Sequence, residues 1–280
     1  MPLVTEPIEA YHAHPSYSKS TLWAYHTQTP YRAKFGKRKS SNAFDVGHAA
    51  HTAILEPHLL ESTVAKGPDD RRGNKWKFAE EEAVASGKIL LTASDYDQVL
   101  LIRDLASTVP ELEAMRDGAL IEQSCYAVDE ETGLTLRCRP DIFSPSLGLM
   151  ADIKNMADIS DDAWSRDLGK FGYHMQDAMY RDVWNKGSDG LEAEAFFFIC
   201  FSKTEPPEVI CRELEPVDVD EGFKAYRAAL AIAAECHKRQ EWPGQPKGVV
   251  RGVKMRDRDR RYTEPQWRKD MEDEESEYVE

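Results

Sequence analysis

The feature that most constrains the fold is an unbroken apolar run in the last third of the chain. Residues 195–201 read Ala-Phe-Phe-Phe-Ile-Cys-Phe, with no polar side chain among them. A run of this length and composition is typical of a central strand that is buried on both faces. The chain is therefore expected to build a sheet that is covered by helices.

The periodicity of the sequence changes along the chain in a way that supports this expectation. Strand patterns, divided by turns at 129–133 and 144–148, are expected at 119–128, 134–143, 149–155 and 208–214. Helices are expected from Ser18 or Ser20 to before Pro30, from Ser41 or Asn42 to before Pro57, and over 75–86, 93–116, 160–186 and 218–240. The order of elements predicts an α/β (α+β) fold with one central mixed β-sheet flanked by helices.

We expect one domain over residues 1–245, with a helical N-terminal part (1–117) and a sheet core (118–242). Residues 246–280 are expected to be a charged, flexible tail. From Glu264 to Glu280, eight acidic residues outweigh Arg268 and Lys269, so this stretch alone carries −6 of the net charge of −14. Runs of this kind are usually solvated.

Charge and cysteine content argue against several classes of protein. No stretch approaches the ~18 apolar residues of a membrane span, and no basic region precedes an apolar one at the N-terminus. The five cysteines include no Cys-x-x-Cys pair, which argues against a disulfide framework and fits reduced thiols in the cytoplasm. The excess of 50 acidic over 36 basic residues disfavours nucleic acid as a partner, but Lys and Arg cluster at 32–39, 71–77 and 251–261.

The most informative motif is Arg139-Pro140-Asp141 followed by Asp152-Ile153-Lys154. A turn centred at 146–147 places Asp141 opposite Asp152, with Cβ atoms roughly 4.5–5.5 Å apart. Opposed carboxylates need a cation between them, and Mg²⁺ takes carboxylate oxygens readily. Lys154 projects from the same face as Asp152 and can orient a water or stabilise phosphate charge. The alternative is a solvent-facing hairpin with ordinary charges, which the apolar flanks of Asp152 disfavour.

Three further residues are candidates for the same site. His51 shares a helix face with Leu55, and His48 competes with it one turn earlier. His51 could instead be a core residue. Glu122 lies near the start of the first expected strand, where a plain surface role is an equal alternative.

Five motifs, in order, give the chain a family resemblance. Gly47-His48-Ala49-Ala50-His51 with Leu55-Glu56-Pro57, the polar segment Asp69 to Trp76, Thr132-Gly133 through Asp141, Asp152-Ile153-Lys154, and Tyr173 to Tyr180 resemble the motifs of RecE (exonuclease VIII)-type PD-(D/E)xK nucleases. The resemblance runs from about Tyr11 to Trp242. It implies a Mg²⁺-dependent deoxyribonuclease, with Mn²⁺ as a substitute, that degrades one strand of linear duplex DNA from its 5′ end.

The resemblance also implies roles for single residues. His51, Asp141, Asp152 and the carbonyl of Ile153 would be metal ligands, and Lys154 would position or activate the attacking water. Glu122 would help to hold a second metal or its water. Gln176 and Tyr180 would support the site from the neighbouring helix, although Tyr180, like Tyr173 and Trp184, could simply be a core residue. The chain lacks the four-cysteine pattern of the iron–sulphur nucleases, so no cluster is expected.

Several residues are expected to contact DNA. Ser18, Lys19 and Ser20 lie at a helix N-terminus, where free N–H groups favour a terminal 5′-phosphate, although ordinary helix capping is the simpler role. The other expected contacts are Arg32, Arg71, Arg72, Lys75, Trp76 and Arg139. Trp76 could be a wedge or stacking residue at the duplex end, and a solvated loop at 71–77 is an equal alternative.

Three functions follow from this reading. The first is a 5′–3′ exonuclease on double-stranded DNA ends, of phage or prophage origin, acting in the bacterial cytoplasm beside a RecT-like single-strand annealing protein. It could form a ring-shaped homo-oligomer. The second is a PD-(D/E)xK endonuclease with the same site, and the third is a non-catalytic module that binds DNA ends or a partner.

Overall fold

The computed structural model describes residues 3–36 and 42–248, and the side chains of 42–44 are not described. The chain divides into two compact units, residues 1–244 and 245–280. In the described part of the chain, no helix combines the length and apolar character needed to cross a membrane.

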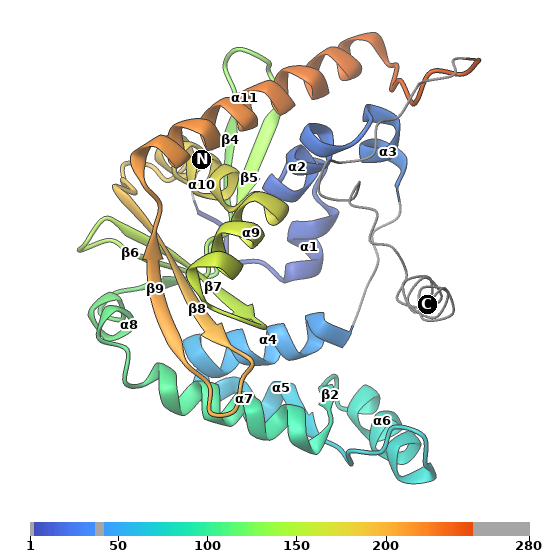
Figure 1. Ribbon diagram of the computed structural model, residues 1–280, viewed down its shortest axis with the longest axis vertical. Helices are drawn as coiled ribbons and strands as arrows, with labels where there is room; N and C mark the ends of the chain where they lie inside the picture. Colours follow the sequence, from blue (N-terminus) through green and yellow to red (C-terminus); the bar gives the residue numbers. More distant parts are fainter. Residues whose placement is uncertain (1–2, 37–41, 249–280) are drawn as a thin grey trace, which may run out of the picture. The chain divides into compact units, whose positions relative to one another are not determined.

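A five-stranded mixed sheet forms the centre of the first unit (Figure 1). Its strand order is β3 (Leu120–Ile121), β6 (Ile142–Ser144), β7 (Leu149–Met156), β8 (Ala195–Ser202) and β9 (Val209–Glu213). β7 and β8 are parallel, and the other pairs are antiparallel. The apolar run at 195–201 lies in β8, between β7 and β9, so the predicted fold class, a central mixed sheet flanked by helices, is confirmed.

The strands expected at 119–128 and 134–143 are wrong in one respect, because each of them is broken. The segment 119–128 divides into β3 and β4 (Cys125–Val128), and 134–143 divides into β5 (Thr135–Cys138) and β6. β4 and β5 pair only with each other, as a separate hairpin. Pro140 lies at the second break, where its missing N–H cannot join a ladder, and Glu122 lies at the first with a φ of +47°.

The N-terminal part is largely helical. It contains α1 (Ile8–Ala13), α2 (Lys19–Thr27), α3 (Pro30–Phe35), α4 (Asn42–Leu55), a 3₁₀ turn (Pro57–Leu59), α5 (Leu60–Thr63), α6 (Asn74–Ala85), α7 (Ala93–Ala106) and α8 (Pro110–Met115). Two short strands, β1 (Val64–Lys66) and β2 (Ile89–Leu91), pair in parallel beside α6. The helix expected over 93–116 is interrupted before Pro110, which fits only in the first turn of a helix.

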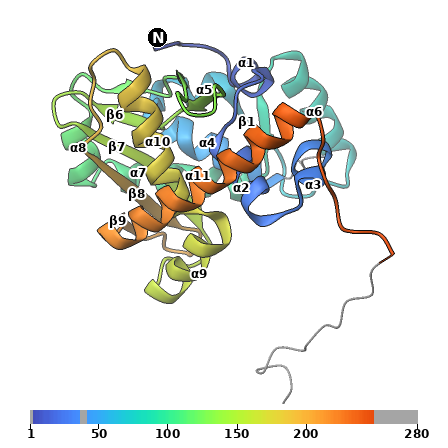
Figure 2. The same ribbon diagram turned by 90° about the horizontal axis from the view of Figure 1, so that it is seen from above.

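The helix expected over 160–186 is also two helices, α9 (Asp161–Phe171) and α10 (Tyr173–Gly187). Gly172 separates them with a φ of +68°, a left-handed conformation that glycine adopts readily. The last helix, α11 (Pro216–Arg239), crosses over α10 (Figure 2).

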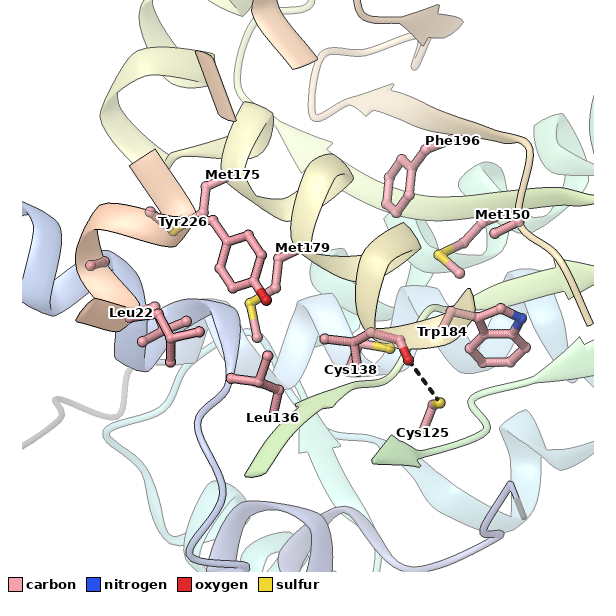
Figure 3. Packing of buried hydrophobic residues seen from close by; sticks show 14 of the residues in the cluster. Leu22, Cys125, Leu136, Cys138, Met150, Met175, Met179, Trp184, Phe196 and Tyr226 are labelled. Atoms are coloured by element: carbon pink, nitrogen blue, oxygen red, sulfur yellow. Dashed lines mark hydrogen bonds between the residues drawn. The ribbon is translucent and has the colours of Figure 1, made fainter. Parts of the chain in front are cut away.

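Each face of the sheet has its own apolar core. On one face Met150, Phe196 and Phe198 pack against side chains of α10, α11 and α2, among them Met175, Met179, Tyr226 and Leu22 (Figure 3). On the other face Ile153, Ile199 and Phe201 pack with Ile54 of α4 and Ile102 of α7. Because side chains alternate along a strand, Asp152 and Lys154 of β7 project toward α10, on the side of Met150.

Candidate active site

The site begins at the β6–β7 hairpin. Ile142 pairs with Ala151, and continuing this register places Asp141 opposite Asp152. The predicted opposition of the two carboxylates is therefore confirmed, although Asp141 lies just before β6, at the break made by Pro140. Both carboxylates are buried, with 8% and 6% of each residue exposed, so the solvent-facing hairpin is excluded.

Asp141 is held by two partners. The backbone N–H of Ile153 donates to its Oδ2 at 2.6 Å, and Nδ1 of His51 lies 3.3 Å from its Oδ1. Burial opposes charge on the imidazole, but the Asp141 carboxylate outweighs burial and raises the pKa of His51 to about 9. Burial likewise opposes charge on Asp141, and His51 lowers the pKa of that carboxyl below its usual value. Of the two candidate histidines, His51 is the one that contacts Asp141. His48 lines the same cavity but is exposed.

Asp152, Lys154 and Gln176 form a closed hydrogen-bonded triangle. The Lys154 ammonium donates to Asp152 Oδ2, the Gln176 amide donates to Asp152 Oδ1 at 2.6 Å, and Lys154 Nζ donates to Gln176 Oε1 at 3.2 Å. Burial and the nearby Asp141 raise the pKa of Asp152. Burial opposes charge on Lys154, but Asp152 outweighs it and raises the pKa of Lys154, so the amine is an ammonium at neutral pH.

Glu122 lines the same cavity, and its N–H donates to the carbonyl of Asp141 at 3.1 Å. Its Oε2 accepts a hydrogen bond from Arg139 at 2.8 Å, and Arg139 also donates to the carbonyl of Glu6 at 2.8 Å. Because Glu122 has a left-handed φ of +47°, its backbone is strained for a residue with a Cβ. A strained acidic residue that is held by an arginine and lines a cavity is not a plain surface residue.

A divalent metal fits the donors that the fold brings together. One ligand atom each from His51, Glu122 and Asp141 lies within 4.8 Å of the others. Hard divalent ions prefer carboxylate oxygens, and an imidazole nitrogen is compatible with Mn²⁺. Asp152 is opposite Asp141, but both of its oxygens accept bonds from Lys154 and Gln176. The N–H of Ile153 is used by Asp141, and the part expected of its carbonyl stays a prediction.

A cavity of about 590 Å³ opens onto these residues. Its walls include side chains that the sequence did not single out, namely Ile8, Tyr11 and His12 of α1. The segment before α1 is tied down by a bridge between Val4 and Ser124 and by Tyr126, which donates to Glu6 at 2.5 Å. Residues 1–17 have little periodicity, so nothing in their pattern could have predicted this position.

The start of α2 lines the cavity as well. Ser18 caps the helix by accepting from the N–H of Thr21 at 3.3 Å, as the simpler of its two expected roles requires. Lys19 donates to the carbonyl of Phe171 at 2.6 Å, and burial together with the Lys154 ammonium lowers the pKa of Lys19 to about 7. Ser18, Lys19 and Ser20 therefore share one cavity with Lys154.

Tyr180, expected to support the site, lines the cavity, and burial raises the pKa of its hydroxyl well above its usual value. Tyr173 lies beside Lys154, whose Nζ is 4.9 Å from the centre of its ring. Trp184 is fully buried in the core, so for this residue the core role holds.

The remaining expected DNA contacts lie outside the walls of the cavity, namely Arg32, Arg71, Arg72, Lys75 and Trp76. The wedge role of Trp76 is wrong, because only 9% of the residue is exposed and its side chain packs beside Gly67, next to β2. The Arg71 guanidinium covers that ring at 5.1 Å and is paired with Asp95 at 3.1 Å.

Comparisons with known proteins bear on the fold and on the family. A search of curated proteins finds no match. A solved structure from Eubacterium rectale, described as a candidate exonuclease, superposes with a TM-score of 0.61 at 15% identity, over 95% of this chain and 96% of that one. The fold is thus shared with that protein. The family model of the PDDEXK-like domain of unknown function matches residues 24–249, and the chain belongs to that family.

Proposed function

We propose that the protein is a metal-dependent deoxyribonuclease, and specifically a 5′–3′ exonuclease that acts on linear double-stranded DNA and leaves 3′ single-stranded overhangs. The observation that carries the proposal is the buried network of His51, Asp141, Asp152, Lys154 and Gln176 around one cavity. Two coupled carboxylates, an ammonium and an imidazole in one site are the groups that phosphodiester hydrolysis needs.

His51, Asp141 and Glu122 would hold the metal, Mg²⁺ or Mn²⁺, with Asp152 and the Ile153 carbonyl as further candidates. When bound, such an ion neutralises phosphate charge and lowers the pKa of a water. Lys154, fixed by Asp152 and Gln176, orients that water and stabilises the charge on the phosphate. Lys154 is thus placed to act as a cation and hydrogen-bond donor toward the phosphate and the attacking water.

The preference for a DNA end rests on the first turn of α2. The positive end of the α2 dipole and Lys19 together favour a doubly charged 5′-phosphate over an internal phosphodiester. Ser18, Lys19 and Ser20 line the cavity that holds Lys154, so a terminal phosphate bound there would lie near the hydrolytic groups. An endonuclease with the same site is the second candidate, since the network itself carries no end preference.

The wider role follows from the RecE-type resemblance and is likewise a proposal. The 3′ overhangs would be substrates for a RecT-like annealing protein in recombination, in a bacterial host and from a phage or prophage. A ring-shaped homo-oligomer would allow processive digestion.

The test compares linear duplex DNA with covalently closed circular DNA, each with Mg²⁺ and with EDTA. Nucleotide release from the linear form alone, faster for a 5′-phosphate than for a 5′-hydroxyl end, is the expected result. Cutting of the closed circle would replace the exonuclease with the endonuclease. A lack of cleavage of both forms with Mg²⁺ and with Mn²⁺ would refute the nuclease and leave a binding module.

A further inference from the structure

A second surface of the molecule, away from the cavity, combines exposed aromatic rings with basic side chains. Tyr31 and Phe35, one helical turn apart on α3, are each 56% exposed. Their ring centres are 5.1 Å apart, and Phe35 meets the edge of Trp242 at 6.0 Å. We call Tyr31, Phe35 and Trp242, with Arg32 and Lys34, the α3 platform.

The platform joins two segments that are far apart in the sequence. The N–H of Tyr31 donates to the carbonyl of Pro243 at 3.1 Å, and Trp242 Nε1 donates to the hydroxyl of Tyr25 at 2.9 Å. These bonds hold Trp242 beside α3, which lies next to α2 and the end of α11 (Figures 1 and 2). The rings are thus fixed by the fold, although Tyr31 and Phe35 stay more than half exposed.

The charge on α3 and in the sequence around it is positive, in a chain of net charge −14. Between Glu9 and Asp45 the sequence has no acidic residue, and its Lys and Arg are at 19, 32, 34, 37, 38 and 39. On α3 itself Arg32 and Lys34 are exposed, and Lys34 Nζ lies 5.0 Å from the centre of the Trp242 ring. Exposed aromatic rings among cations are suited to a polyanion that also carries flat apolar groups, and single-stranded nucleic acid is such a ligand.

The position of the platform relates it to the cavity. α2 begins with the residues that line the cavity and ends three residues before α3. Its nine residues span ~13 Å at 1.5 Å per residue. That length corresponds to about four nucleotides at ~3.4 Å each.

We propose that the α3 platform binds the unpaired bases of a single DNA strand by stacking, a few nucleotides from the cavity. This inference rests on the proposed nuclease function for its choice of DNA, but the binding itself needs no cleavage. Tyr31 and Phe35 stack with bases, and Arg32 and Lys34 neutralise the adjoining phosphates.

The test measures binding of a short fluorescein-labelled oligothymidylate to the full chain by fluorescence anisotropy, in EDTA so that no strand is cut. The double variant Tyr31→Ala/Phe35→Ala is expected to bind at least tenfold more weakly, about 1.4 kcal/mol, with an unchanged salt dependence. Tyr31→Trp keeps an aromatic ring and should retain the affinity. Arg32→Ala/Lys34→Ala should reduce the salt dependence.

The matched control is Phe223→Ala, on α11, whose ring is 44% exposed beside Lys224. It should bind as the wild type does. Wild-type affinity in Tyr31→Ala/Phe35→Ala, an equal loss in Phe223→Ala, or no strand binding by the wild type would each overturn the platform. DNA cleavage is scored in a separate assay, so failure of the platform and failure of the nuclease can be told apart.

Discussion

Replacing Gly172 with alanine tests how the fold positions the site. Gly172 joins α9 to α10 in a left-handed conformation, and a Cβ there would lie 2.5 Å from the Trp23 ring of α2. The backbone conformation costs a residue with a Cβ ~1–2 kcal/mol, and forcing the ring away costs about 1–3 kcal/mol more. We therefore expect Gly172→Ala to lower the free energy of unfolding by roughly 2–5 kcal/mol.

The same substitution should impair the site. Gln176 is in the first turn of α10, where its N–H donates to the carbonyl of Gly172 at 3.1 Å. A shift of about 1 Å in that turn would pull its amide from Asp152, and misplacement on this scale can lower a rate by ~100-fold. Urea unfolding and the rate of DNA cleavage measure the two effects.

Gly169→Ala is the control, because nothing lies within 4 Å of a Cβ at that position in α9. It should gain up to ~1 kcal/mol in the free energy of unfolding, from helix propensity. If Gly172→Ala unfolds at the same urea concentration as the wild type, or if Gly169→Ala loses as much, the steric reasoning is wrong.

Three more outcomes are expected. Excess Mn²⁺ should raise the melting temperature of the wild type by mass action, whereas Asp141→Asn should show a smaller shift or none; equal shifts in calorimetry would argue against this metal site. Burial raises the pKa of Asp177 to about 6, against the opposing effect of Arg181. The contribution of this carboxyl to the free energy of unfolding is therefore complete below about pH 4 and is lost as the pH rises through 6. The difference in the free energy of unfolding between the wild type and Asp177→Asn, measured in urea titrations, should fall by about 3 kcal/mol over that range. Because the pKa of Lys19 is lowered to about 7, the wild type should bind 5′-phosphorylated ends more tightly than Lys19→Met at about pH 6, and this difference in affinity should be lost by about pH 8.5. A ratio of the two affinities that stays constant with pH would contradict the role of Lys19.

The pairing of Asp141 with Asp152 could be predicted from the sequence because a hairpin has few degrees of freedom. Once the turn is placed at 146–147, the two-residue period of a strand fixes every opposed pair. The apolar neighbours of Asp152 then decide which face is buried. The histidine of the site could be narrowed only to His48 or His51, since helical spacing does not say which turn of α4 faces the sheet.

Other features depend on contacts that local pattern does not contain. Pro140 indicates a break in the strand. The sequence does not show that β4 and β5 then leave the main sheet, because this depends on which strand β3 pairs with. Trp76 illustrates the opposite error, because a tryptophan in a basic loop looks accessible until the packing of Gly67 against it is known. The wall formed by α1 depends on hydrogen bonds to residues more than a hundred positions away.

The central claim is that Lys154, held by Asp152 and Gln176, serves hydrolysis of DNA at this site. The most direct measurement is the rate of nucleotide release from linear duplex DNA with Mg²⁺ by the wild type, by Lys154→Ala and by Lys224→Ala. Lys224 is 60% exposed on α11 and is the control for loss of a lysine. We predict a loss of at least ~100-fold for Lys154→Ala, as for removal of one oriented donor, and no loss for Lys224→Ala. A folded Lys154→Ala protein that cleaves at the wild-type rate would contradict the claim.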